Sequence, residues 1–116
     1  MIAAAGDSPA DQLRALVEFH VDFALDNPAL ITVQDRDLGA LAEADARRVR
    51  SRQRRYVEEW VGVLTRVHPG GTTDMCRARA HAVFGLINST PHSAGRLPRP
   101  AMAELLTAMA EAAARA

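Results

Sequence analysis

Residues that commonly perform catalysis are few in this sequence, and their spacing does not suit catalysis. Cys76 is the single cysteine and lies in the first turn of a predicted helix, where the helix dipole can lower the pKa of a thiol. A small buried apolar residue is the commoner role for such a cysteine. Glu58 and Glu59 are adjacent, so on a helix their side chains diverge by about 100° and make no paired-carboxylate site. None of the four serines stands in a nucleophile elbow and no glycine-rich phosphate loop is present, so we expect no catalytic residues and no enzyme.

The four histidines do not predict a metal site. None has another His, Asp, Glu or Cys three or four residues away, which is the spacing that puts two ligands on one helical face. His20 and His81 fall within predicted helices on or near apolar faces, where a hydrogen-bonded core or pocket histidine is the commoner explanation. We therefore expect neither a metal nor another cofactor.

Six arginines fall within nine residues of one predicted helix: Arg47, Arg48, Arg50, Arg52, Arg54 and Arg55. Such a cluster could bind phosphate. However, glutamates stand four residues before Arg47 and four residues after Arg54 and Arg55, the spacing of ordinary ion pairs on a helix. The arginines also point around most of the helix. We therefore interpret the cluster as a solvated face.

The aromatic residues are the stronger functional signal. All five fall on three predicted helices: Phe19, Phe23, Tyr56, Trp60 and Phe84. Plain core packing explains any single one of them. Together they also suit an apolar cavity with a few polar groups at its wall, such as His20, Gln53, His81 and Asn88.

The elements that would position these residues are all helices, because apolar residues recur every three or four positions and never alternate. The chain has 116 residues, 48% of them hydrophobic, which is enough for one domain and too few for two. It has no net charge, whereas a nucleic-acid-binding domain usually has a net basic charge. We expect a flexible leader over 1–8 and one domain over 9–116. Five helices are predicted: over 9–25, a short one from Pro28 that becomes polar at Gln34, then over 41–68, over 74–88, and from Pro100 onward.

The helix over 74–88 is apolar nearly all round. One side carries Cys76, Ala80, Val83 and Ile87, and another carries small residues, namely Ala78, Ala82, Gly85 and Ser89. A helix of this kind is buried on more than one side. Either the domain itself wraps the helix, or a second subunit covers the small-residue side, and the pattern leaves both open. The last helix adds a stripe of Met102, Leu105, Leu106 and Met109, which are core or interface residues.

No targeting or membrane signal is apparent. The first residues lack a basic region and are too short for a signal peptide, and no apolar run approaches the length that spans a bilayer. A cytoplasmic location with no membrane partner is the default expectation.

The order of these features resembles the C-terminal domain of TetR-type (tetracycline-repressor-like) transcriptional regulators. The resemblance rests on Asp26-Asn27-Pro28-Ala29-Leu30 after an amphipathic helix, on the long helix with Tyr56, Val57 and Trp60, on RARAHAVFGLINS over 77–89, and on the closing helix with Met102 to Met109. It covers nearly the whole chain.

The resemblance implies a cytoplasmic homodimer that binds a small apolar effector between its helices. The last two helices would form a four-helix bundle with the partner's pair. DNA would be bound only through an N-terminal helix-turn-helix, which we expect to be absent from this chain because only a short leader precedes Pro9. The effector-binding residues would be Phe19, His20, Phe23, Tyr56, Trp60, Phe84 and Asn88. The dimer interface would be formed by Ala78, Ala82, Gly85, Ser89, Met102, Leu105, Leu106 and Met109. A helical protein-interaction module without a pocket is the alternative.

Overall fold

The structure, a computed structural model, describes residues 8–28, 43–89 and 95–116, and these ranges are helical with no strand. They contain four helices: α1 (Pro9–Asp26), α3 (Glu43–Val67), α4 (Thr73–Asn88) and α6 (Arg99–Arg115). The all-α prediction is confirmed, but the count in the described ranges is four helices and not five. The predicted short helix from Pro28 falls almost wholly on residues outside those ranges, as does the predicted leader over 1–8 apart from Ser8.

The helix ends follow the capping residues in the sequence. The Ser8 hydroxyl accepts a hydrogen bond from the Asp11 N–H at 3.0 Å, and Pro9 occupies the first turn of α1. The Thr72 hydroxyl accepts one from the Met75 N–H at 3.1 Å at the start of α4. Such bonds satisfy N–H groups that have no partner within the helix.

Replacing the α1 cap tests its contribution directly. Ser8→Ala removes the acceptor of the Asp11 N–H and should lower the free energy of unfolding by about 1 kcal/mol. Urea unfolding followed by circular dichroism measures this loss. Ser8→Asn keeps a capping oxygen and should restore most of it, whereas equal losses for both variants would show that the cap hydrogen bond does not stabilise α1.

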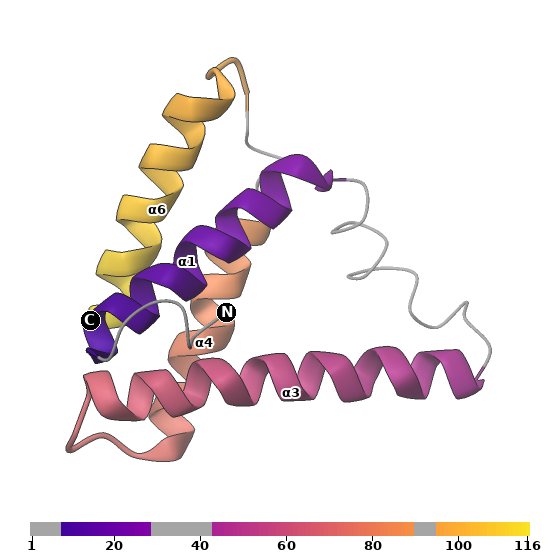
Figure 1. Ribbon diagram of the computed structural model, residues 1–116, viewed down its shortest axis with the longest axis vertical. Coiled ribbons are helices and arrows are strands. Elements are labelled where there is room, and N and C mark those ends of the chain that lie inside the picture. Colours follow the sequence, from indigo (N-terminus) through magenta and orange to yellow (C-terminus); the bar gives the residue numbers. More distant parts are fainter. Residues whose placement is uncertain (1–7, 29–42, 90–94) are drawn as a thin grey trace.

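Figure 1 shows α1 crossing in front of α4, with α6 along one flank and α3 running across one end of the molecule. The N-terminal half of α3 extends away from the other helices. Two sets of polar contacts fix α6: Arg99 at its start binds Asp26 and Asp22 of α1, and the carbonyls of Ala114 and Ala116 at its end accept bonds from His68 and Arg79.

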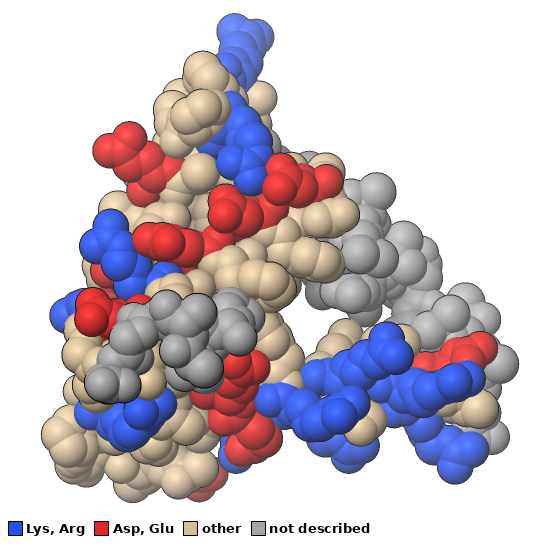
Figure 2. Space-filling view, in the orientation of Figure 1, with Lys and Arg blue, Asp and Glu red and all other residues tan. Residues whose placement is uncertain are grey.

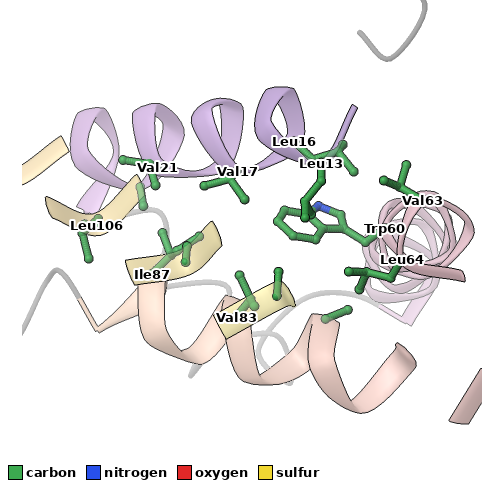
Figure 3. Packing of buried hydrophobic residues seen from close by; sticks show 14 of the residues in the cluster. Leu13, Leu16, Val17, Val21, Trp60, Val63, Leu64, Val83, Ile87 and Leu106 are labelled. Carbon is green, nitrogen blue, oxygen red and sulfur yellow. The ribbon is translucent and has the colours of Figure 1, made fainter. Parts of the chain in front are cut away.

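The core is built from one apolar face of each helix. Figure 3 shows Trp60 of α3 pointing toward Leu13 and Leu16 of α1, with Val83 and Ile87 of α4 on the opposite side of the core from α1. Trp60 is the largest fully buried side chain, and Cys76 is also fully buried, as the sequence predicts. No helix in the described ranges is long and apolar enough to cross a membrane.

Candidate functional site

His20 lies where three helices meet and forms a hydrogen bond with each of the other two. Its Nδ1 lies 2.9 Å from the Tyr56 hydroxyl of α3, and its Nε2 lies 2.9 Å from Oδ1 of Asn88 in α4. A carbonyl oxygen can only accept, so Nε2 carries the proton and Nδ1 accepts the proton of the Tyr56 hydroxyl. A neutral imidazole, with its single proton on Nε2, makes both hydrogen bonds.

Aromatic rings surround this polar chain. The His20 and Phe84 rings stack with centroids 5.1 Å apart and an interplanar angle of 6°, and Tyr56 stacks on both at 5.7 Å. Trp60 meets Phe84 edge-on at 5.1 Å, and Phe19 lies beside Tyr56 at 6.4 Å. We call these five residues the ring cluster.

The ring cluster and Asn88 bring together six of the seven residues predicted to bind an effector. Phe23 is the exception: it is half-buried and packs against the apolar core, outside the ring contacts of the described residues. Of the other two candidates for the cavity wall, Gln53 is exposed and His81 is an exposed residue whose ring meets Phe84 edge-on at 5.9 Å.

Burial governs the electrostatics of this cluster. It lowers the pKa of His20 below the ordinary value of 6.5, against a smaller raising effect of the Asn88 hydrogen bond. It also raises the pKa of Tyr56 to about 12, against a smaller lowering by the neighbouring Trp60 indole. The fully buried Trp60 Nε1–H nevertheless makes no hydrogen bond of normal geometry with the described residues.

The lowered pKa of His20 predicts a dependence of stability on pH. Below pH 6.5 the folded protein binds fewer protons at His20 than the unfolded chain does. The free energy of unfolding therefore keeps the full contribution of the neutral His20 above pH 6.5, and loses it as the pH falls from 6.5 toward the lower pKa of the folded state. His20→Gln removes the titrating group and should flatten the pH profile of the urea midpoint in that window. Identical slopes for the variant and the wild type would contradict the neutral, buried histidine.

A second candidate surface lies on α4 and α6. Its positions carry no charged side chain, and we call them the α4–α6 face: Met75, Ala78, Ala82, Gly85, Leu105, Met109 and Ala112. All seven are exposed in the single chain. Met75, Leu105 and Met109 are three of the five large apolar side chains exposed in the described ranges. Soluble proteins rarely leave an apolar surface of this kind uncovered.

The two halves of this face lie on flanks that adjoin. On α6, Glu111 points to α1, where it pairs with Arg14 at 3.5 Å, and the core residues come next around the helix. At about 100° per residue, Leu105 and Met109 fall beyond the core residues, on the flank away from α1. On α4, Phe84 faces the ring cluster, whereas Arg79 bonds the end of α6. Met75 and Ala82 fall beside Arg79, so the face is continuous across both helices.

The structure divides the predicted interface residues. Ala78, Ala82, Gly85, Leu105 and Met109 lie on the α4–α6 face, and Ser89 lies half-buried at the end of its α4 half. Met102 and Leu106 do not lie there, because they are 6% and 3% exposed and belong to the core of their own domain. The sequence analysis missed Met75 and Ala112, although Met75 extends the 3–4 spacing of the small residues on α4.

A shallow groove of about 610 Å³ lies elsewhere, between α1 and α6. Its walls are mainly charged and include Arg14, Glu18, Asp22, Glu104 and Glu111. It contains none of the predicted effector-binding residues. In the described ranges no three His, Cys, Asp or Glu side chains gather as metal ligands would.

The comparison with protein families agrees with this helix order. A family model described as tetracyclin repressor-like, C-terminal domain, matches residues 6–113. A search of the curated proteins finds no match to the chain. Because the family model spans nearly the whole sequence, the chain belongs to the family of tetracycline-repressor-like C-terminal domains, which are parts of regulators rather than enzymes.

Proposed function

We propose that this domain is the effector-sensing and dimerisation domain of a transcriptional regulator. The α4–α6 face is the observation that carries the proposal, since an exposed, uncharged surface on two adjoining helices needs a partner, and a second copy supplies the same surface. The two copies would pair α4 and α6 with their counterparts in a four-helix bundle. DNA would be read by a helix-turn-helix module N-terminal to α1.

The ring cluster is the proposed effector site. Apolar rings with a few convergent polar groups are typical of small-molecule sites. Phe19 is 47% exposed and its neighbour Tyr56 is half-buried, so the cluster can be reached from the α1–α3 side. The Trp60 N–H offers a donor to an effector that carries an acceptor atom, and His20, Tyr56 and Asn88 offer exchangeable hydrogen bonds.

The same contacts suggest how the two sites communicate. Asn88 and Phe84 belong to α4, which also carries half of the α4–α6 face. An effector that separates Asn88 from His20 would shift α4 relative to α1 and α3, and with it the partner's helices. It would favour one of two dimer arrangements by its differential affinity for them.

Trp60 provides the test, because it is the only tryptophan and lies in the proposed site. Small apolar compounds would be screened for a change in its emission and for a raised Tm, since a ligand at 100 times its Kd adds about 2.7 kcal/mol. His20→Ala and Asn88→Ala should weaken such compounds at least tenfold, and the control Met75→Ala should not. If Met75→Ala weakened the binding of these compounds and the ring-cluster variants left their affinity unchanged, the compounds would bind outside the ring cluster.

A protein-interaction module without a pocket is the second candidate. It is favoured by the close stacking of the rings, with three centroid separations of 5.1 to 5.7 Å among His20, Tyr56 and Phe84. On this alternative, Trp60 emission responds to no small compound, and the exposed faces bind another protein.

A further inference from the structure

The N-terminal half of α3 carries a dense and exposed positive charge. All six arginines predicted to form a solvated face are exposed, and we call them the arginine face: Arg47, Arg48, Arg50, Arg52, Arg54 and Arg55. Figure 2 shows arginine side chains covering this half of α3, where it extends away from the other helices. The surface is therefore open to a large partner.

The arginines form two parallel rows on one broad side of the helix. At about 100° per residue, one row contains Arg47, Arg50 and Arg54, and the other contains Arg48, Arg52 and Arg55. Together they occupy about 200° of the circumference, opposite the side on which Tyr56 and Trp60 face the core. They therefore cover rather more than half of the circumference, in two rows rather than in one strip.

The ion pairs expected to neutralise this face are largely missing. Glu58, expected to pair with Arg54, instead binds Arg77 of α4, and Glu59 forms no ion pair with Arg55. Of the arginine face, Arg48 is paired, with Asp45 at 2.7 Å. Arg50, Arg52, Arg54 and Arg55 have no ion pair with a described residue, so the face is exposed to solvent as expected, but the predicted pairs of Arg54 with Glu58 and Arg55 with Glu59 do not form.

Many of the compensating acids lie on other elements than α3. The chain has no net charge, yet Glu18 and Asp22 of α1 and Glu104 and Glu111 of α6 gather around the α1–α6 groove. Figure 2 shows acidic side chains along that part of the molecule and basic ones over α3. The overall neutrality thus conceals a strongly basic face.

We propose that the arginine face binds the phosphate backbone of double-stranded DNA without reading its sequence. The six arginine charges lie along about 12 Å of helix, which is a linear density of one positive charge per about 2 Å. This density is close to that of the duplex, which carries one phosphate charge per about 1.7 Å of its axis. Guanidinium groups bind phosphate oxygens in bidentate pairs. A membrane surface fits less well, because none of the exposed large apolar side chains in the described ranges lies on α3 to insert among lipids. The proposal rests on neither the effector site nor the dimer interface.

The experiment uses the whole 116-residue chain and a fluorescent 20-base-pair duplex of arbitrary sequence. Anisotropy titrations between 50 and 200 mM NaCl should give a log–log salt slope between about −3 and −5, as expected for several phosphate contacts. Arg50→Gln with Arg54→Gln should weaken binding at least roughly tenfold at 50 mM NaCl and reduce the magnitude of the slope by about 1.8. Arg52→Gln with Arg55→Gln should do the same through the other row.

Arg66→Gln with Arg115→Gln is the matched control, because it removes two exposed arginines outside the arginine face and changes the net charge equally. It should change the affinity less than roughly threefold. An equal effect of the control and row variants, or no binding at 50 mM NaCl, would overturn the proposal. So would tighter binding of poly-glutamate, which would assign the face to an acidic protein, or of phosphatidylcholine–phosphatidylserine (3:1) vesicles, which would assign it to a membrane. Circular dichroism verifies that each variant is folded.

Discussion

Gly85→Leu is expected to convert a dimer into a monomer that remains folded. A Cβ atom at Gly85 meets nothing within 4 Å in the single chain, so the domain itself accommodates the larger residue. In a symmetric dimer the substitution occurs twice across the interface, and overpacking costs about 1–3 kcal/mol at each site. The dimer dissociation constant should rise by at least roughly 25-fold, from a loss of about 2 kcal/mol or more. Sedimentation equilibrium measures the change.

Gly62→Leu is the matched control for this substitution. Gly62 is also exposed and lies within a helix, and a Cβ there likewise meets nothing within 4 Å, but it lies on α3, outside the α4–α6 face. It should leave the dimer affinity unchanged. If Gly85→Leu also leaves the affinity unchanged, or if Gly62→Leu weakens it as much, the dimer does not form through α4 and α6.

Trp60→Ala is expected to cause the largest loss of stability. Trp60 is fully buried, and its ring contacts His20, Tyr56 and Phe84, so the substitution removes core packing and opens a cavity between α1, α3 and α4. Such a change costs about 3–5 kcal/mol, a large part of the 5–15 kcal/mol that stabilises an ordinary domain. Urea unfolding by circular dichroism measures the loss, at fixed protein concentration because dimerisation adds to apparent stability.

Trp60→Phe separates packing from hydrogen bonding. It keeps an aromatic ring in the cluster and deletes an N–H that makes no hydrogen bond of normal geometry with the described residues, so its cost should be well below that of Trp60→Ala. Equal losses for the two variants would mean that the N–H is satisfied in solution. That result would also remove the donor that we assign to an effector.

Local structure could be predicted because it depends on neighbouring residues. Ser8 and Pro9 specify the start of α1, and Pro69-Gly70-Gly71 follows the end of α3 with only His68 between them. The helical spacing of apolar residues likewise predicted the long helix that carries the buried Trp60. These features need no knowledge of how the helices pack.

Features that depend on packing were predicted less well. Met102 and Leu106 share an apolar stripe with Leu105 and Met109, and the sequence cannot show that the core ends between the two pairs. The pairing of Glu58 with Arg77, 19 residues away, depends on the crossing of α3 and α4, so the i,i+4 rule assigned it to the wrong arginine. The bonds of His20 to Tyr56 and Asn88 span three helices and likewise follow only from their packing.

Oxidation of methionines most directly tests the coverage of the α4–α6 face by a second copy. Met75 and Met109 are 54% and 46% exposed in the single chain, whereas Met102 is 6% exposed in the core and serves as the internal reference for a folded domain. Dilute peroxide would be applied across a range of protein concentrations, and sulfoxide at each methionine would be quantified by mass spectrometry. We predict that Met75 and Met109 become protected as the concentration rises, and that Gly85→Leu abolishes the protection. Oxidation of both at the rate of free methionine at every concentration would contradict the account.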